Sequence, residues 1–278
     1  MSELSHSAAL AAAAPHAASS RPLVRLNRIS KVFSSGTVAL KDMTLDVGQG
    51  EFISLLGPSG CGKSTALRII AGLGDTSSGT LEWPTSDHDA LGKAHPEISF
   101  VFQEPTLMPW ATVFANVWLP LRLKGISKEA ARERVSEALE MVGLGQFHEA
   151  FPRELSGGMK MRVSIARALV TRPKLLLMDE PFAALDEITR FKLNNDLLRL
   201  WQRFGWTVIF VTHSVYESVY LSNRIVVMAA RPGRVVSDLA VDAPYPRDEE
   251  FRTSSVYNDY CRQTSAALHA AMDVRDHL

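Results

Sequence analysis

The sequence predicts an α/β fold with a mostly parallel sheet, and three observations support this. Short apolar segments such as EFISLLG (51–57), KLLLMD (174–179) and WTVIFV (206–211) have the length of strands. Helical segments separate them, and strands that are apolar on both faces belong to parallel sheets covered by helices. The chain has 278 residues, 46% of them hydrophobic, which suffices for one large domain or two small ones.

The residues before the first buried strand divide into a tail and a small β unit. Residues 1–21 are rich in alanine, lack the basic start of a signal peptide, and are expected to be disordered. Short strands between Leu23 and Val47 flank a turn at Ser34–Gly36, which predicts an N-terminal antiparallel β subdomain. No apolar run reaches the ~18–20 residues that span a bilayer.

An inserted helical subdomain is expected over about residues 104–170, because the strand pattern stops after EISFVF (97–102). Ser127 is a candidate N-cap, apolar residues recur at helical spacing from Val135 to Val142, and Gly143 ends the pattern. With a last strand at RIVVMA (224–229), the main domain is predicted to cover residues 22–241.

Residues 242–278 form a C-terminal extension that is rich in proline and charge and includes a predicted helix at 257–272. It is either a flexible extension, which we favour, or a regulatory helix.

Charge and cysteine content exclude some classes of protein. Thirty basic residues offset thirty acidic ones, so no basic face and no nucleic-acid partner are predicted. Two cysteines, Cys61 and Cys261, are too few for a disulfide framework and fit a reducing cytoplasm.

The strongest motif is GPSGCGKST, which matches G-x-x-x-x-G-K-[ST] between a strand and a helix and indicates a P-loop NTPase (RecA-like) core. Glycines let backbone amides turn toward phosphate oxygens, and the helix N-terminus adds positive potential. We expect Lys63 to neutralise the β- and γ-phosphates and Ser64 to ligate Mg²⁺. A bulky thiol reagent on Cys61 should therefore block nucleotide binding. The predicted nucleotide-binding residues are Gly57, Pro58, Ser59, Gly60, Cys61, Gly62, Lys63, Ser64 and Thr65.

Polar side chains follow three of the predicted strands. Asp179 ends KLLLMD, where a carboxylate can hold Mg²⁺ through water, and the adjacent Glu180 is our candidate general base. His213 follows WTVIFV, at the sheet edge where open α/β folds bind ligands, and could contact the γ-phosphate. Gln103 follows EISFVF and can bind Mg²⁺ or water. Taken singly, the acidic pair could be a solvated turn, His213 a capping residue and Gln103 a loop residue.

A second candidate anion-binding element is the Ser-Gly-Gly stretch in LSGGMKMRVSIARAL (155–169). It opens a predicted amphipathic helix but has no P-loop lysine. Ser156 can cap the helix, Gly157 and Gly158 admit a close approach, and the helix dipole favours an anion. A helix that merely begins with Ser-Gly-Gly is the less attractive alternative, because glycine weakens a helix start. One chain thus carries two phosphate-binding elements.

In order along the chain, GPSGCGKST, Gln103, LSGGM, LLLMDE, Ala-Leu-Asp at 184–186 and His213 resemble the ATP-binding subunits of ABC transporters. The resemblance covers roughly Leu23 to Arg234, and LSGG is its specific element. It implies an ATPase that uses ATP and Mg²⁺, in which two cassettes pack head to tail as a homodimer. Ser156, Gly157 and Gly158 of one subunit would then complete the site of the other.

The resemblance also implies roles for residues outside these motifs. Phe33 matches the aromatic residue that stacks on adenine, with Val38 in the same pocket, although Phe33 could equally be a core residue. Asp186 matches the loop that links the two sites, and Gln103 the loop that senses the γ-phosphate and contacts the membrane partner. Three departures from the family pattern remove no charge from the catalytic set: Met159, Ala183 and Ser214.

The phrases VFQEPTLMPWATVFANV, DEPFAALDEITR and RPGRV resemble importers for nitrate, sulfonates and taurine, a group that includes relatives for pyrimidine or thiamine precursors. This implies a peripheral protein on the cytoplasmic face of the inner membrane, with two permease subunits and a periplasmic solute-binding protein. The permease would contact the segment 104–121, whose Trp110 and Trp118 could also be core. A non-transport ABC ATPase and a P-loop kinase are the alternatives, disfavoured by the single cassette and by LSGG respectively.

Overall fold

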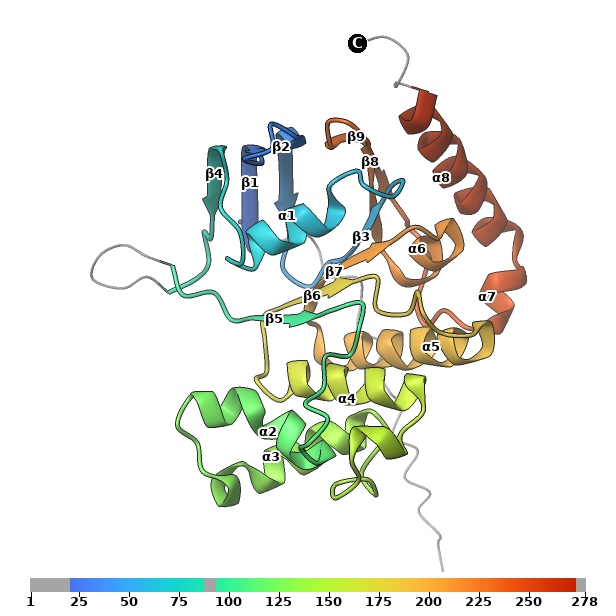
Figure 1. The fold of residues 1–278 in the computed structure, drawn as a ribbon. Coiled ribbons are helices and arrows are strands. Elements are labelled where there is room, and N and C mark those ends of the chain that lie inside the picture. The colour runs from blue at the N-terminus through green and yellow to red at the C-terminus, as the bar shows by residue number, and fades with distance from the viewer. Residues whose placement is uncertain (1–20, 88–93, 274–278) are drawn as a thin grey trace, which may run out of the picture.

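The computed structural model describes residues 21–87 and 94–273, so the tail expected at residues 1–21 lies outside it except for Arg21. Within the described residues, a six-stranded sheet has the order β5-β6-β7-β3-β8-β9 (Figure 1). All neighbouring strands are parallel except the pair β8 and β9, which confirms the mostly parallel sheet. The strands are β3 (Phe52–Leu56), β5 (Ile98–Val101), β6 (Leu175–Asp179), β7 (Thr207–Thr212), β8 (Arg224–Ala229) and β9 (Arg234–Ala240).

The central strands end at a common edge of the sheet. Every residue of β3, β6 and β7 is buried, as their continuous apolar sequences predict. In the pairing register Leu56 lies opposite Thr212, and Asp179 lies opposite Val211. The residues that follow these three strands therefore meet at the carboxyl edge of the sheet, where α/β folds bind ligands.

A second sheet of three antiparallel strands, β2 (Val38–Val47), β1 (Val24–Val32) and β4 (Ser78–Glu82), stands beside the first (Figure 1). It contains the antiparallel strands expected near the N-terminus, together with β4, which the sequence did not indicate. The sequence of β4, SGTLE, is polar and largely exposed. Its pairing is tight, because a Cβ atom on Gly79 would lie 2.3 Å from the carbonyl oxygen of Arg28.

The expected helical segment contains α2 (Val113–Leu123), α3 (Lys128–Met141) and α4 (Gly157–Leu169). Ser127 caps α3, its Oγ accepting from the Ala130 amide at 3.2 Å, and Gly143 follows the helix with a φ of 72°. Figure 1 shows α2 and α3 below the sheet, with α4 between them and the sheet.

The remaining helices cover the sheet on both faces. Helix α1 (Lys63–Ile70) lies on one face, and the chain turns soon after it at Gly72, which has a φ of 68°. Helices α4 and α5 (Glu187–Phe204) lie on the other face, and α6 (Val215–Leu221) follows β7 (Figure 1). No helix in the described ranges is long and apolar enough to cross a membrane.

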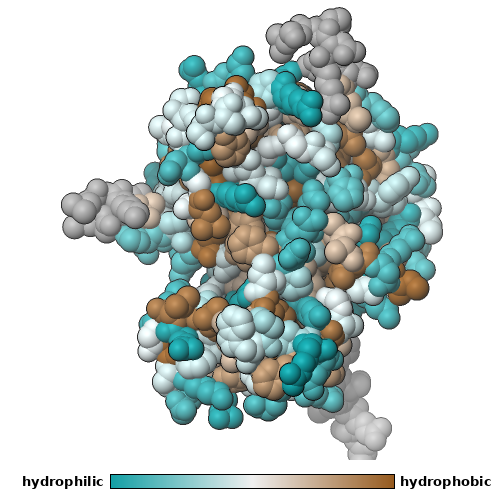
Figure 2. Space-filling model, viewed as in Figure 1, coloured by the Kyte–Doolittle hydropathy of each residue, from teal (hydrophilic) through white to brown (hydrophobic). Residues whose placement is uncertain are grey.

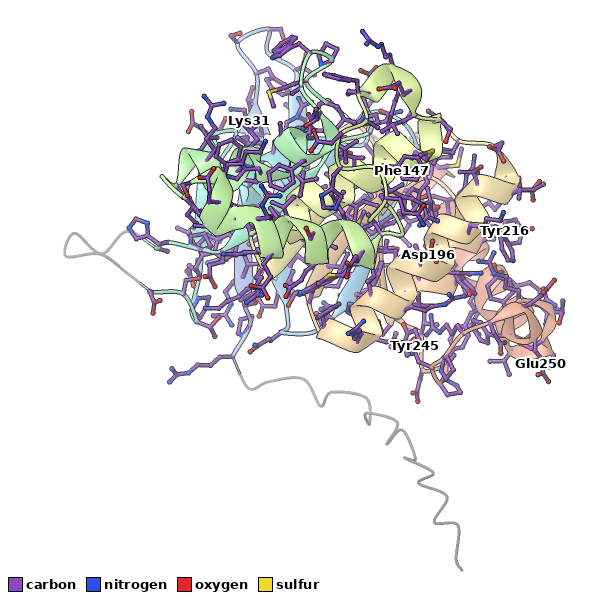
Figure 3. All side chains as sticks on the ribbon, turned by 90° about the horizontal axis from the view of Figure 1, so that it is seen from below. Lys31, Phe147, Asp196, Tyr216, Tyr245 and Glu250 are labelled. Carbon is purple, nitrogen blue, oxygen red and sulfur yellow. The ribbon has the colours of Figure 1, made fainter. Side chains whose placement is uncertain are left out.

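The C-terminal segment differs from the flexible extension that we expected. Helices α7 (Glu249–Thr253) and α8 (Ser255–Asp273) pack on the core, which buries Tyr257, Cys261 and Ala271. Figure 3 shows Tyr245 and Glu250 on this side of the molecule, and the Tyr245 ring lies 4.9 Å from that of Trp201 in α5. The proline- and charge-rich composition suggested an exposed segment. In the structure, however, one of the charged residues, Arg247, is buried.

Candidate functional site

The loop that joins β3 to α1 closes around the ammonium group of Lys63. This Nζ donates to the carbonyl oxygens of Gly57 at 2.8 Å and Pro58 at 3.2 Å, and the residue is only 4% exposed. A Cβ atom on Gly57 would lie 2.6 Å from the carbonyl oxygen of Met228, so the loop requires glycine there. The buried cation is thus held by neutral carbonyl groups, which an anionic phosphate can replace as partners.

Gly60 and Gly62 give the same loop its curvature. Their φ angles are 75° and 93°, in the left-handed region that favours glycine. A Cβ atom on Gly60 would meet nothing within 4 Å, so the tip of the loop faces open space. Gly62 is the N-cap of α1, whose first backbone amides are therefore available to an anion. The loop fits a polyphosphate.

Cys61 corrects one expectation from the sequence. Its side chain is fully buried, with Sγ 3.9 Å from Lys63 Nζ. Burial raises the pKa of the thiol, and the nearby Lys63 charge opposes that shift. Because only an accessible thiolate reacts readily, a bulky thiol reagent should label Cys61 slowly, and the predicted block of nucleotide binding does not follow.

Ser64 and Asp179 lie side by side although 115 residues separate them. The Ser64 hydroxyl donates to Asp179 Oδ1 at 2.8 Å, and Asp179 is 8% exposed. Burial is the main cause that raises the pKa of Asp179, the charge of Glu180 adds to it, and the hydrogen bond from Ser64 opposes it. Adjacent hydroxyl and carboxylate oxygens are the hard ligands that Mg²⁺ prefers, so this pair fits that ion.

Glu180 lies between the residues that follow β3 and β7. Its carboxylate oxygens are 3.8 Å from Lys63 Nζ and 3.5 Å from His213 Nδ1. Its φ is 46°, unusual for a residue other than glycine, and its amide donates to the carbonyl oxygen of Val211 at 3.1 Å. The sheet therefore brings together a cation, a carboxylate and an imidazole that are distant in sequence.

Gln103 lies further from this centre. It follows β5, which pairs with β6 so that Val101 is opposite Met178, and its side chain is exposed. Among the described residues, no hydrogen bond joins Gln103 to Ser64 or Asp179. The structure places it at the same edge of the sheet without making it part of the Ser64–Asp179 pair.

The Ser-Gly-Gly element (residues 156–158) lies at the start of α4, beside the start of α5. Ser156 Oγ accepts from the Met159 amide at 3.3 Å, and Asp186 caps α5 by accepting from the Thr189 amide at 2.9 Å. A Cβ atom on Gly158 would lie 2.6 Å from Thr189 Cγ2, so the two helix starts are in close contact. Hydrogen bonds from Thr189 lower the pKa of Asp186.

This element and the P-loop are separate within one chain. In the described ranges, no hydrogen bond or ion pair joins residues 156–158 to residues 57–65 or to Glu180. Ser156 and Gly157 are exposed. The element is therefore available to a molecule outside its own chain.

The aromatic residues near the site divide into exposed and packed ones. Phe33 is 46% exposed and Val38 is 42% exposed, at the tip of the β1–β2 hairpin, so the core alternative for Phe33 is wrong. Trp118 packs against the core and donates to the carbonyl oxygen of Ile126 at 3.0 Å. Trp110, in contrast, is 76% exposed.

The sequence motifs gave no role to Glu217, which lies in α6, four residues after His213. Its carboxylate accepts from the Thr212 hydroxyl at 2.5 Å and lines a small pocket together with Glu180 and His213. A signal was present, because Ser214 and Glu217 have the Ser-x-x-Glu spacing of a helix capping box.

Comparison with known proteins identifies similar sequences. A model of the ABC transporter family matches residues 40–183. A putative ATP-binding protein of Brucella abortus biovar 1 is 47% identical over 234 residues, 84% of this chain and 88% of that protein. An aliphatic sulfonates import ATP-binding protein of Bacillus cereus is 44% identical over 229 residues, 81% of this chain and 89% of that protein.

Solved structures are similar as well. A Clostridium perfringens protein that is part of the ABC transporter complex cbiONQ superposes with a TM-score of 0.72 at 28% identity, over 90% of this chain and 98% of that one. A dimeric ATP-binding cassette in a post-hydrolysis state, bound to ADP and Pi, has a TM-score of 0.67 at 36% identity, over 80% of this chain and 100% of that one. The chain therefore belongs to the family of ABC transporter ATP-binding proteins, ATP-binding cassettes that hydrolyse ATP.

Proposed function

We propose that this protein is the ATP-hydrolysing subunit of a bacterial ABC importer, which powers uptake of a small anion or related solute through separate membrane subunits. The observation that carries the proposal is the position of Glu180, whose carboxylate lies 3.8 Å from Lys63 Nζ and 3.5 Å from His213 Nδ1. A carboxylate between a phosphate-binding cation and an imidazole is suited to activating water.

ATP would bind with its phosphates in the loop of residues 57–65. Lys63 Nζ would exchange the carbonyl oxygens of Gly57 and Pro58 for phosphate oxygens. Ser64 and Asp179, with Gln103 at the neighbouring strand end, would hold Mg²⁺, which neutralises phosphate charge when bound. Phe33 and Val38, both exposed, would contact the adenine ring.

Hydrolysis needs a base and a group that holds the reacting phosphate. Glu180 would take a proton from water while the water oxygen attacks the γ-phosphorus and the bond to ADP breaks. His213, which is exposed beside Glu180, would hydrogen-bond the γ-phosphate. Lys63 stabilises the charge that develops on the phosphate oxygens.

The active unit would be a homodimer in which each chain completes the site of the other. Ser156, Gly157 and Gly158 of one cassette would contact the γ-phosphate in its partner, and Asp186 would link the two sites. This is supported by the separation of the two elements within one chain, and by a solved relative that is a dimeric cassette. The exposed start of α4 supplies the helix dipole that favours an anion.

A hollow between the sheet and helix α2 would receive the permease. Its volume is about 990 Å³, and its lining includes Trp83, Phe100, Leu119 and Leu123. Figure 2 shows apolar side chains on both sides of the waist between the upper and lower parts of the molecule. The protein would thus lie peripherally on the cytoplasmic face of the inner membrane, with two permease subunits and a periplasmic solute-binding protein.

The cargo we propose is a sulfonate, taurine or nitrate. Similar relatives include an aliphatic sulfonates import ATP-binding protein, 44% identical to this chain. Import of a pyrimidine or thiamine precursor by the same subfamily is the alternative. Uptake of labelled sulfonate, taurine, nitrate and pyrimidine by a deletion strain distinguishes these cargoes, and unchanged uptake of all of them removes the proposed cargo class.

Glu180→Gln tests the proposed hydrolysis. The amide keeps the shape of the side chain but cannot take a proton, so ATP binding should persist while turnover falls by about 10²–10⁴-fold. The protein should also accumulate as a nucleotide-bound dimer, detected by gel filtration in MgATP.

Glu137→Gln is the matched control, because Glu137 lies on α3 with a half-exposed side chain that forms an ion pair with Arg172. This variant should hydrolyse ATP at the wild-type rate. Equal turnover by Glu180→Gln and the control would remove Glu180 as the base.

A further inference from the structure

The turn that carries His213 is closed by a ring of three hydrogen bonds. The Thr212 hydroxyl donates to Glu217 Oε2 at 2.5 Å, and the Ser214 amide donates to Thr212 Oγ1 at 3.0 Å. The Glu217 amide then donates to Ser214 Oγ at 3.3 Å. In a simple capping box the carboxylate accepts directly from the N-cap amide. Here the Thr212 hydroxyl is inserted between them, so the ring fixes the backbone on both sides of His213.

The second oxygen of Glu217, Oε1, makes no hydrogen bond of normal length in the described part of the chain, although burial raises the pKa of this carboxyl and the side chain of Asn194 in α5 opposes that shift. Glu217 Oε1 is closed to solvent, and so is Arg190 Nε, which lacks a hydrogen-bond partner among the described residues. Both residues line the same small pocket as Glu180 and His213. A buried carboxylate oxygen and a buried guanidinium nitrogen without hydrogen bonds of normal length are costly, which calls for an explanation.

Arg190 connects this pocket to the start of α5. Its Nη2 donates to the carbonyl oxygen of Leu185 at 2.9 Å, one residue before the Asp186 cap. The Asp186 loop is the part of the chain proposed to face the partner cassette. A small displacement of α5 would therefore move Arg190 relative to Glu217.

We propose that Glu217 is a positioning residue for His213. Its carboxylate holds the His213 turn through Thr212, and its second oxygen is the point through which Arg190 and Asn194 of α5 transmit the position of the partner cassette. The inference rests on the proposed ATPase. A displacement of His213 by ~1 Å suffices for a large effect on turnover, because catalysis depends on near-attack geometry.

A purely structural cap makes a different prediction. If Glu217 only stabilised α6, its loss would lower the free energy of unfolding and leave the turnover of the folded protein unchanged. A residue that acts through His213 lowers kcat, and its effect disappears once His213 is removed.

The test compares the full-length wild type with Glu217→Gln, His213→Ala and the double variant in steady-state ATP hydrolysis. We expect Glu217→Gln to lower kcat about tenfold while KM for ATP stays within about twofold. In the His213→Ala background, the same change should alter kcat by less than about twofold. Glu137→Gln is again the matched control. Thr212→Val removes the hydroxyl of the ring and should reproduce the pattern even if Glu217→Gln folds poorly.

Two results would overturn the inference while leaving the ATPase intact: full kcat in both Glu217→Gln and Thr212→Val, or equal losses with and without His213. A wild-type chain that binds MgATP without hydrolysing it would overturn the proposed function, and the role of Glu217 with it.

Discussion

At the scale of single residues, the site depends on the unusual backbone conformation of Glu180, which the contacts of its neighbours hold in place. Glu180 has a φ of 46°, and a residue other than glycine in this region carries about 1–3 kcal/mol of strain. Its amide is fixed to Val211, and its carboxylate faces Lys63 and His213. The strain is local, and it accompanies a carboxylate that lies 3.8 Å from Lys63 Nζ.

Gly157 offers a test of the proposal that residues 156–158 contact the phosphate of a partner cassette. A Cβ atom there would meet only Leu185 Cδ2 at 3.6 Å, an ordinary contact, so Gly157→Ala should fold normally. If a partner's phosphate approaches this residue, the added methyl group obstructs it, and hydrolysis should fall by about tenfold or more. Steady-state turnover and the thermal unfolding midpoint together measure the two effects.

Gly74→Ala is the control, since a Cβ atom there also makes only ordinary contacts, at 4.0 Å. Wild-type turnover by Gly157→Ala would mean that nothing outside the chain approaches Gly157 closely. Gly158→Ala should differ from both, because its Cβ atom would lie 2.6 Å from Thr189 Cγ2 and would strain the contact between α4 and α5 within the chain.

At the scale of elements, the C-terminal helices are joined to the helices that carry the site. The guanidinium of Arg252 in α7 lies between the rings of Phe191 in α5 and Tyr220 in α6, at 3.4 and 3.5 Å. The Tyr220 hydroxyl donates to the carbonyl oxygen of Arg247 at 2.7 Å. The extension is therefore part of the folded core.

Arg247 is the main attachment of this segment, and its loss should destabilise the whole protein. The residue is 4% exposed, and its guanidinium donates to backbone carbonyl oxygens. Its acceptors are Val219, Tyr220, Ser222, Val241 and Ala243. Arg247→Ala leaves these acceptors without a donor, so the free energy of unfolding should fall by about 3 kcal/mol, measured by denaturant titration.

Arg262→Ala is the comparison, because Arg262 is largely exposed on α8 and forms an ion pair with Asp259. Its effect should stay within about 0.5 kcal/mol. Equal stability of the two variants would show that the segment from residue 247 onward contributes little to the fold.

At the scale of the whole molecule, one apolar surface, the hollow beside α2, is left uncovered. The six-stranded sheet is packed on both faces, whereas the hollow between that sheet and α2 remains open, with Leu123 79% exposed at its rim. An exposed apolar concavity of this size is typical of a site that binds another protein.

Leu123→Glu tests this surface. A carboxylate at the rim would have to lose water on contact with an apolar helix of the proposed permease. Association with that permease should therefore weaken by about tenfold or more. The measurement is the fraction of the protein retained on detergent-solubilised membranes when the neighbouring genes are co-expressed. Val236→Glu, at an exposed position on β9 outside the hollow, should be retained like the wild type. Equal retention of both variants would place the permease contact elsewhere.

The sequence by itself determined the strands and the chemistry placed at their ends. Fully apolar runs fix β3, β6 and β7, and the Gly-Lys-Ser motif and the Asp-Glu pair are recognisable because phosphate and Mg²⁺ require those side chains at that spacing. Such signals are local, so they can be read from a few consecutive residues.

Only the tertiary structure decided which of these groups meet. The pairing register brings Ser64 to Asp179, and Glu180 to Lys63 and His213. It also buried Cys61 and Arg247, and it exposed Phe33 and Trp110, where local sequence left burial and exposure equally open. The reason is physical: whether a side chain is buried, and what it faces, depends on residues far away in the chain that close packing brings against it.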